Sequence, residues 1–491
     1  MDHNEYQRLA AQGYTHIPLV RELPADLDTP VGVYLKLANS PNSYLLESAD
    51  EGRYWGRYSI IGMSCSNYIQ VNHLTVSLYE GGCLSMQQEV SNPLSWVEDY
   101  LATFNIAQSK SLPRFCGGLV GYFSYETACY IEPKLATATL KKPDELATPD
   151  IFLMVSMQIA VIDNLRGMLS LIVYADTSHE DGYQQALDTI QELEGRLRTP
   201  SVSLPSVAVQ VPNERDFSFG FTQSDYMDAV EKCRRYIIDG EVMQVALSQR
   251  MQAPFECNAF NLYRALRRLN PSPYMFYFNL DEFNIVGSSP EILVRKETEQ
   301  LTLRPIAGTR RRGETDAEDL RLEKELLSDD KELAEHLMLI DLGRNDLGRV
   351  AKVGSVQVTD KMLIERYSHV MHIVSNVVGV ASPNTSAVEV LRATFPAGTV
   401  TGAPKVRAME IIAELEPVKR NIYSGAVGYI GWNGIMDLAI AIRTAVIKEQ
   451  TLFVQTGAGL VYDSQPQKEW LETMNKADVL LAAARMAKDF A

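Results

Sequence analysis

Residues 302–350 read TLRPIAGTRRRGETDAEDLRLEKELLSDDKELAEHLMLIDLGRNDLGRV, and this stretch changes character three times. Its apolar, strand-like lead ends at Gly308-Thr309, where a glycine lets backbone amides approach a ligand closely. The basic run Arg310 to Arg312 that follows is interpreted as a solvated loop. A capping box at Asp329 then predicts a helix with one apolar stripe. The stripe comprises Leu333, Leu337 and Ile340.

Glu335 lies about 140° around this helix from Ile340, on the side away from the stripe, because each residue turns a helix by roughly 100°. It is therefore expected to face solvent or a cleft. A small-residue loop beside a helix that carries carboxylates predicts binding of a polar, anionic small molecule through amides and a metal. The stretch alone does not identify that molecule.

Length and composition exclude several classes of protein. The chain has 491 residues, 22% of them charged and 46% apolar, which is typical of a soluble enzyme of two or three domain-sized units. Its net charge of −16 argues against nucleic-acid or anionic-membrane partners, which are held mainly by Lys and Arg. The six cysteines include no C-x-x-C pair, and no signal peptide or membrane-length apolar run is evident. We expect a cytoplasmic protein.

The order of patterns predicts an α+β protein with antiparallel hairpins. Residues 1–200 alternate short strand-like runs with turns and form an N-terminal α+β region. Residues 201–219 are rich in Pro and Ser and are the predicted linker. Stronger helical and strand periodicity marks residues 220–491 as a second region.

Two predicted strands of the second region each carry one candidate polar residue, Gln244 on the first and Arg443 on the second. In the alternating run 242–250, Gln244 shares a face with Val242, Ala246 and Ser248, and a satisfied core amide is favoured there over a pocket residue. Asn433-Gly434 predicts a hairpin turn, followed by one long strand over residues 436–447. On that strand, small side chains lead to Arg443 and leave room for a carboxylate, although a lone strand Arg is usually a surface ion pair.

Other stretches could hold anions or metals. Pro404, in Phe395 to Lys405, opens a predicted helix whose exposed amides could bind an anion, without a P-loop pattern. His369 and His372 would lie on opposite strand faces, so they make a poor joint metal site. Glu469, Glu472 and Lys476 share one helix face and would alone be interpreted as a solvated ion-pair stripe. Glu335 and Glu472 with a third acid nearby would suit Mg²⁺.

Together these segments resemble the chorismate-utilising enzyme family, and within it most closely the synthase subunits of anthranilate synthases. The resemblance spans essentially the whole chain and is densest from Ser224 to Ala484. It implies an α+β fold of two large antiparallel sheets, packed orthogonally and flanked by helices. The motifs that carry it are PIAGT (305–309), DDKELAEH (329–336), DLGRNDLGRV (341–350), GTVTGAPK (398–405), YSGAVGY (423–429) and GAG (457–459).

The resemblance also implies roles for single residues. Glu335 and Glu472 would hold Mg²⁺, which in turn holds the ring carboxylate of chorismate. Glu291 would be the general acid for departure of the C4 hydroxyl, His372 would serve the later elimination of pyruvate, and Gln244 would belong to the catalytic set. The implied substrate-binding residues are Gly308, Thr309, Thr399, Tyr423, Arg443, Gly457, Ala458, Gly459 and Lys476.

Two positions discriminate within the family. Aminodeoxychorismate synthases of one common type carry a nucleophilic Lys where Ala307 stands, and isochorismate and salicylate synthases carry a Lys base near Gln244. Alanine and an amide cannot do that chemistry. The implied activity is therefore conversion of chorismate and ammonia to anthranilate and pyruvate, the first step of tryptophan biosynthesis. Alternatives are a 2-amino-2-deoxyisochorismate synthase of secondary metabolism, an aminodeoxychorismate or isochorismate synthase, or a non-catalytic metabolite sensor.

The resemblance finally implies a partner and an inhibitor. No glutamine amidotransferase domain follows the synthase region, so ammonia would come from a separate glutaminase subunit, in a heterotetramer of two synthase and two glutaminase subunits. LLES (45–48) and NPSPYM (270–275) resemble the family's tryptophan feedback pocket. Ser48, Pro273, Tyr274 and Met275 would hold L-tryptophan. The alternative for these residues is a turn-and-core role.

Overall fold

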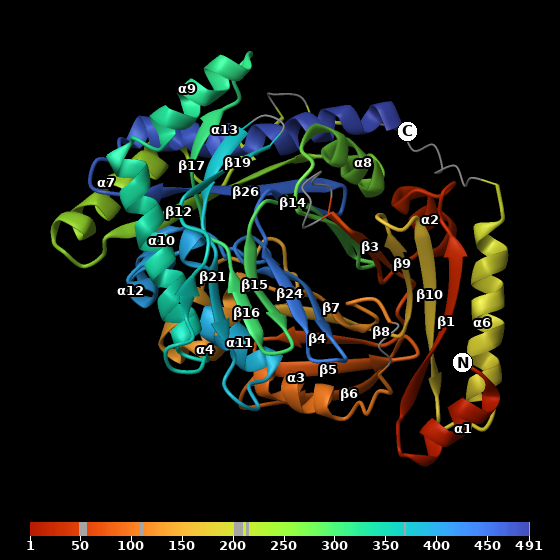
Figure 1. Cartoon of the computed structure of the whole chain (residues 1–491). Coiled ribbons are helices and arrows are strands. Elements are labelled where there is room, and N and C mark those ends of the chain that lie inside the picture. Colours follow the sequence, from red (N-terminus) through yellow and green to blue (C-terminus); the bar gives the residue numbers. More distant parts are fainter. Residues whose placement is uncertain (49–55, 109–111, 201–209, 213–215, 368–369, 491) are drawn as a thin grey trace.

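Two large antiparallel sheets dominate the structure, a computed structural model that describes residues 1–48, 56–108, 112–200, 210–212, 216–367 and 370–490 (Figure 1). The α+β prediction with antiparallel strands is confirmed. In Figure 1, β26 of the first sheet lies across the direction of β15 and β16 of the second. No helix among the described residues is long and apolar enough to cross a membrane.

The first sheet has twelve strands within the described residues. In spatial order they are β1 (His16–Pro24), β10 (Met168–Asp176), β9 (Gln158–Asp163), β3 (Tyr58–Gly62), β2 (Ser43–Glu47), β13 (Tyr274–Asn279), β14 (Phe283–Ser289), β25 (Thr444–Lys448), β26 (Thr451–Leu460), β12 (Gln244–Pro254) and β11 (Ser218–Phe219), with β22 (Gly402–Ala403) paired to the start of β12.

The second sheet has eleven strands in the same described ranges, and a three-stranded sheet lies beside it. The second sheet runs β18 (Gln357–Val358), β21 (Val377–Val380), β16 (Gln300–Leu303), β15 (Ile292–Glu297), β24 (Met436–Ile440), β23 (Ala426–Gly431), β7 (Gly118–Phe123), β8 (Ile151–Ser156), β4 (Tyr68–Asn72), β5 (Thr75–Glu80) and β6 (Cys83–Glu89). The small sheet runs β17 (Ile306–Arg311), β20 (Val370–Val374) and β19 (Leu363–Arg366).

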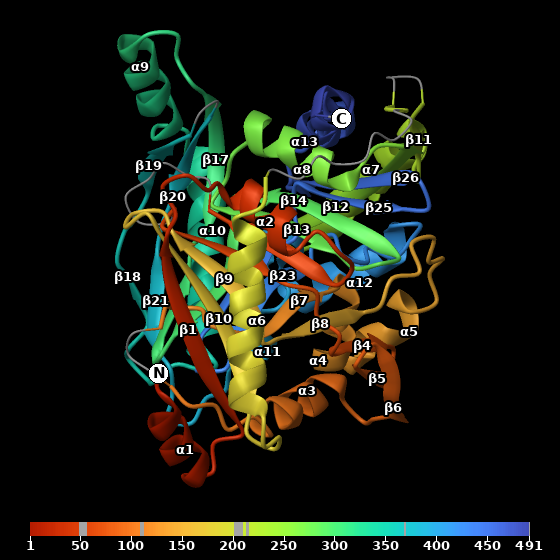
Figure 2. The ribbon, with the colours of Figure 1, turned by 90° about the vertical axis from the view of Figure 1, so that its right-hand side faces the viewer.

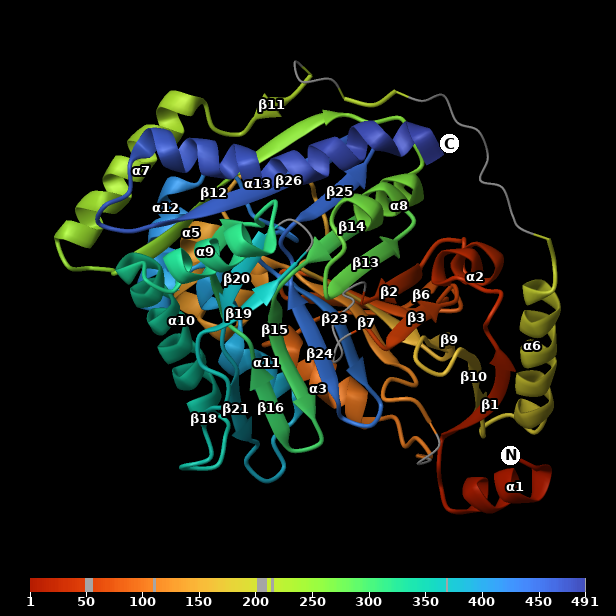
Figure 3. The ribbon, with the colours of Figure 1, turned by 45° about the horizontal axis from the view of Figure 1, so that its top comes forward.

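Helices cover the outer faces of the sheets. Figure 2 shows α6 along β1 and β10, and Figure 3 shows α13 along β26 and β12. The α-helices are α1 (His3–Ala11), α2 (Pro30–Leu37), α3 (Pro93–Ala102), α4 (Ala128–Ile131), α5 (Ala136–Thr139), α6 (Gly182–Leu197), α7 (Gln223–Ile238), α8 (Ala259–Leu269), α9 (Asp316–Leu326), α10 (Asp330–Gly348), α11 (Ala387–Thr394), α12 (Lys405–Leu415) and α13 (Pro466–Met486).

The central core lies between the two large sheets. Tyr44 and Phe276 of the first sheet pack in one buried cluster with Tyr122, Phe152 and Val427 of the second. A second cluster joins the outer face of the first sheet to α2, α6, α8 and α13. Alternating apolar residues on these strands supply both clusters, because successive strand side chains point to opposite faces.

Both large sheets contain strands from either side of the predicted linker. The division into residues 1–200, 201–219 and 220–491 stays a prediction, and residues 201–209 and 213–215 of the linker lie outside the described residues. Within the remaining part of the linker, Ser218–Phe219 forms β11 on the edge of the first sheet.

The prediction of a single long strand over residues 436–447 is wrong. The hairpin at Asn433-Gly434 forms as expected, but the strand breaks into β24 in the second sheet and β25 in the first. Arg443 lies in the break with φ +50°, a left-handed conformation that no regular strand contains. The chain therefore passes from one large sheet to the other at this arginine.

The two expectations for residues 302–350 also need correction. Of the predicted stripe, Ile340 is buried and Leu333 packs partly buried against a small apolar cluster, but Leu337 is 43% exposed. The buried face of α10 also includes His336, Leu339 and Gly343. The arginine run is no solvated loop, because Arg310 and Arg311 belong to β17.

Each arginine of this run forms ion pairs with α9 or with the start of α10. Arg310 contacts Asp329 at 2.8 Å, and Arg312 contacts Asp319 at 2.9 Å. The complementary charges of the acidic helices explain why the run is ordered on the surface of the small sheet.

Candidate active site

The predicted site residues meet where β12, β26, α10, α13, the small sheet and the crossover at Arg443 come together. A chain of contacts joins them. Gln244 reaches Glu335, the Lys476 ammonium donates to the Gly457 carbonyl at 3.0 Å, and Thr309 reaches His372. Segments that are far apart in the sequence thus build one polar site.

Glu335 on α10 and Glu472 on α13 form the acidic side of the site. Glu335 is half-buried, and its pKa is raised by burial and then by the nearby Glu332 and Glu472 carboxylates. Glu472 is exposed and pairs with Lys476 of the same helix at 2.7 Å. A cation between the two helices would relieve the repulsion between these carboxylates.

Within the described residues, no three His, Cys, Asp or Glu side chains form a ready-made metal cluster. Two carboxylates that act on one another through their charges nevertheless fit Mg²⁺, which is held by one or two carboxylates together with waters and substrate oxygens. Of the described groups, Glu335 and Glu472 would hold it.

Gln244 begins β12 and is 3% exposed. Its amide nitrogen donates to Glu335 Oε1 at 3.3 Å, while its Oε1 is buried without a hydrogen-bond partner among the described groups. A satisfied core amide, favoured from the sequence, is therefore not what the structure contains. A buried carbonyl without a donor costs free energy, so this atom suits a bound N–H or O–H group.

Glu291 lies between β14 and β15 and is 5% exposed. Burial raises the pKa of its carboxyl to about 7. The hydroxyl of Thr399, in the short 3₁₀ helix Gly398–Val400, donates to Glu291 Oε1 at 2.7 Å and lowers the pKa, as Arg443 does through its charge. A carboxyl group of this kind carries a proton to give at neutral pH.

His372 on β20 faces a bulge in β17 at Gly308, which has φ +67° and interrupts the register between Ala307 and Thr309. Its Nδ1 lies 3.1 Å from the Gly308 carbonyl. Because a carbonyl only accepts, Nδ1 carries the proton of the neutral ring and Nε2 keeps its lone pair. Burial lowers the pKa of His372 to about 4, so the ring is a neutral base at pH 7. His369 lies outside the described residues.

Arg443 is half-buried at the crossover between the sheets, and no ion pair or side-chain hydrogen bond of its guanidinium is found among the described residues. Burial lowers the pKa of Arg443, while the nearby Tyr423, Glu472 and Glu291 raise it through their charges. An arginine so placed could bind a carboxylate with two parallel hydrogen bonds. The small side chains expected beside it are present, since Ala441 is fully buried.

The Gly457-Ala458-Gly459 segment of β26 gives the close approach that was predicted. A Cβ at Gly457 would lie 2.8 Å from the Tyr423 hydroxyl, and one at Gly459 would lie 2.5 Å from Gln244 Nε2. β25 pairs with β26 only up to Ala445↔Val454, so this segment has no described strand on that side. Its backbone can therefore bind a ligand.

The remaining predicted residues line a separate cavity, which is partly open to solvent. Ser48, Pro273, Tyr274 and Met275 contribute to it, and the Ser48 hydroxyl is buried without a partner in the described structure. Predominantly apolar walls with a few polar groups are typical of small-molecule pockets. Sequence reasoning missed other residues of its wall, namely Arg114, Arg295, Tyr429 and Asp437.

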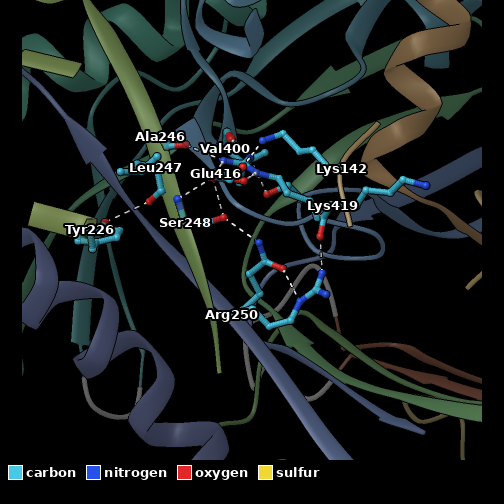
Figure 4. Close-up of polar contacts among 12 residues, drawn as sticks. Lys142, Tyr226, Ala246, Leu247, Ser248, Arg250, Val400, Glu416 and Lys419 are labelled. Atoms are coloured by element: carbon cyan, nitrogen blue, oxygen red, sulfur yellow. Dashed lines mark hydrogen bonds and ion pairs between the residues drawn. The ribbon is translucent and has the colours of Figure 1, made fainter. Parts of the chain in front are cut away.

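A buried ion pair was also missed. Arg420 donates to Glu416 at 2.6 Å and to the Val400 and Ala246 carbonyls at 2.7 Å each. Glu416 accepts from the backbone and hydroxyl of Ser248, both at 2.8 Å (Figure 4). The pair thus ties the loop of Thr399 to the strand of Gln244. Nothing in the sequence distinguishes these charges from surface charges.

Comparisons with known proteins identify the family of this chain. A family of chorismate binding enzymes matches residues 43–482. Anthranilate synthase component 1 of Neisseria meningitidis is 54% identical over 488 residues, 99% of this chain and 98% of that protein. The Pseudomonas aeruginosa protein of the same name is 52% identical over 490 residues, 99% of each chain.

Solved structures show the same fold. The crystal structure of anthranilate synthase component I from Streptococcus pneumoniae matches with a TM-score of 0.75 and 35% identity, covering 94% of this chain and 99% of that one. The menaquinone-specific isochorismate synthase of Escherichia coli, 19% identical, matches with a TM-score of 0.71 over 98% of each chain, which shows the fold alone. The protein belongs to the family of chorismate binding enzymes.

Proposed function

We propose that this protein is the synthase component of an anthranilate synthase, converting chorismate and ammonia to anthranilate, pyruvate and water. The buried, unpaired Oε1 of Gln244 carries this proposal. It can accept a hydrogen bond from ammonia, whereas an amide cannot deprotonate water. The names and lengths of the relatives at 48–54% identity support it.

In the first step, ammonia attacks C2 of the ring. The ring double bonds shift, and the C4 hydroxyl leaves as water with a proton from Glu291. The proton that the new ammonium group loses balances the proton that Glu291 gives. Mg²⁺, when bound, would hold the ring carboxylate and offset its charge. Arg443 would bind the second carboxylate, and the Gly457 to Gly459 backbone would orient the ring.

In the second step, Nε2 of His372 accepts the proton on C2 while the C3–O bond breaks. The electron pair leaves with enolpyruvate, which becomes pyruvate on protonation, and the ring becomes aromatic. A positioned base of this kind contributes roughly 10²- to 10⁴-fold. The neutral state of His372 at pH 7 supports this assignment.

Two further properties belong to the proposal. Ammonia comes from glutamine through a separate glutaminase subunit, in a complex of two subunits of each kind in the cytoplasm, since the relatives are named as component 1 of their synthases. L-tryptophan binds the cavity lined by Ser48, Pro273, Tyr274 and Met275 and inhibits the enzyme. The apolar walls of this cavity, and the Ser48 hydroxyl that has no partner among the described groups, support an amino-acid ligand, with the ion-paired Arg295 and Asp437 also on the wall.

The test is incubation of the purified chain with chorismate, Mg²⁺ and ammonium while anthranilate fluorescence is followed. We expect anthranilate, and none when ammonium is omitted. A non-aromatic amino product would instead identify an aminodeoxyisochorismate synthase. Product without ammonium would show water as the nucleophile and refute the role of Gln244.

A further inference from the structure

The cavity and the proposed general acid are connected through two adjacent strands. β13 carries the cavity residues Tyr274 and Met275, and these pair directly with Ser289 and Ser288 of β14. Glu291 follows Ser289 after a single proline. A displacement of the cavity wall therefore acts on the residues just before the acid.

Side-chain hydrogen bonds continue this connection. The Ser272 hydroxyl, next to the cavity residue Pro273, donates to the Ser289 carbonyl at 2.8 Å. The Ser289 hydroxyl donates to the Glu291 carbonyl at 3.2 Å and lies 3.3 Å from the Glu291 amide. Ser272 is 4% and Ser289 0% exposed, so water does not compete for these bonds.

Ser288 makes a parallel connection to the proposed substrate arginine. Its backbone amide donates to the Arg443 carbonyl at 3.1 Å, and its hydroxyl donates to the Asn270 carbonyl at 2.5 Å. Asn270 begins the same segment, residues 270–275, that ends at the cavity. Neither Ser272, Ser288 nor Ser289 lines the cavity.

We propose that Ser272, Ser288 and Ser289 are positioning residues that couple the cavity lined by Tyr274 and Met275 to Glu291 and Arg443. A ligand that favours one arrangement of residues 270–275 thereby changes the placement of the acid and of the substrate arginine. A ligand can shift this equilibrium only by its difference in affinity between the two arrangements. The inference rests on the proposed function, because it names chorismate and L-tryptophan as the two ligands.

Several groups hold the Glu291 carboxyl in place, so a displacement of this carboxyl should change the measured rate of the reaction. Arg443 faces it from the crossover, the Thr399 hydroxyl from the 3₁₀ helix and the Ile306 amide from β17. A second cavity is lined by Glu291 together with Arg304 and Asp346. A displaced carboxyl group would lose its place among these groups, and proton transfer to the leaving hydroxyl would slow.

The experiment measures the affinity of L-tryptophan by calorimetry, with and without saturating chorismate and without ammonium, so that no turnover occurs. Linkage requires that each ligand change the affinity of the other by the same factor. The variants are Ser272→Ala, Ser272→Cys and Ser289→Ala. Ser272→Cys nearly keeps the size of the side chain but weakens its hydrogen bond to the Ser289 carbonyl. This variant therefore tests the hydrogen bond without leaving a cavity that could impair folding.

Ser43→Ala is the matched control. Ser43 is a buried serine of β2 in the same sheet, and its hydroxyl donates to the Ser40 carbonyl at 2.6 Å. It lines neither the cavity nor the proposed active site. The variant thus removes an equivalent buried bond without touching the proposed connection. Thermal unfolding of every variant checks that it is folded.

We expect chorismate to weaken L-tryptophan binding about tenfold in the native chain and in Ser43→Ala, and less than about twofold in the Ser272 and Ser289 variants. Ser289→Ala should also lower kcat for ammonium-dependent anthranilate formation about tenfold with KM for chorismate little changed, while Ser43→Ala keeps both. The inference is overturned if chorismate still weakens L-tryptophan binding about tenfold in folded Ser272 and Ser289 variants. It is also overturned if chorismate has no such effect in the native chain. Failure of the native chain to form anthranilate would overturn the proposed function separately.

Discussion

Replacing Thr399 by valine should raise the pKa of Glu291 further above its usual range. Their hydrogen bond is 2.7 Å long and stabilises the charged carboxylate in a site where burial already raises the pKa to about 7. A hydrogen bond to a charged group contributes about 1.5–3 kcal/mol. One pKa unit corresponds to about 1.4 kcal/mol. Loss of the hydroxyl should therefore raise the pKa by about one to two units.

The sign of the effect on activity follows from the role of Glu291. A general acid works in its protonated form, so activity is present below its pKa and is lost as the pH rises through it. In the native chain, kcat/KM for chorismate should fall above about pH 7. In Thr399→Val this alkaline limb should move upward by about one to two pH units.

The assay is anthranilate fluorescence at saturating Mg²⁺, with the total ammonium adjusted at each pH to keep free ammonia constant. Thr401→Val is the control, since the Thr401 hydroxyl donates to the Ala397 carbonyl at 2.9 Å in the same loop and makes no hydrogen bond to Glu291 within the described structure. It should leave the alkaline limb in place. An unchanged or lowered limb in Thr399→Val would show that Glu291 is not the titrating acid.

Other changes test the remaining assignments. Glu335→Gln should abolish Mg²⁺-dependent turnover, and normal activity across a Mg²⁺ titration would contradict its role as a ligand. His372→Asn should slow pyruvate elimination about 10²-fold or more, so a non-aromatic amino intermediate should accumulate on chromatography; rapid anthranilate release would show that another group acts as the base. Met275→Thr should weaken L-tryptophan inhibition with activity retained, and full inhibition would place the inhibitor elsewhere. Arg420→Ala should lower the free energy of unfolding by about 3–5 kcal/mol, because Glu416 is left buried and unpaired; a denaturation midpoint within error of the native one would refute this.

The sequence was informative wherever a local pattern determines local structure. The hairpin at Asn433-Gly434 and the strand that carries Gln244 formed as predicted, because turn residues and periodicity act over a few neighbours. The convergence of Glu335, Glu291 and Arg443 could be anticipated only through the family resemblance. Their segments are separated by dozens of residues, and no periodicity links them.

Features that depend on tertiary contacts were not predictable from the residues alone. The change of sheet at Arg443 is set by the partners of β24 and β25, since residues 436–447 have the alternation of an unbroken strand. Arg310 was interpreted as solvated, yet it is held by acids of the following helices. Leu337 was predicted to be buried on α10, yet it is exposed and the neighbouring His336 enters the core, where its ring contacts the Ser375 hydroxyl.

The crossover at Arg443 has a mechanical consequence. The residue belongs to neither large sheet, while Gly457 to Gly459 belong to the first and Glu291 leads into the second. A ligand that contacts all three would cross-link the two layers of the protein at the point where the chain itself joins them. Substrate binding would then resist separation of the layers and raise the unfolding temperature with ligand concentration. Arg443 would then both contact the anionic substrate and mark the point where the chain passes from one large sheet to the other.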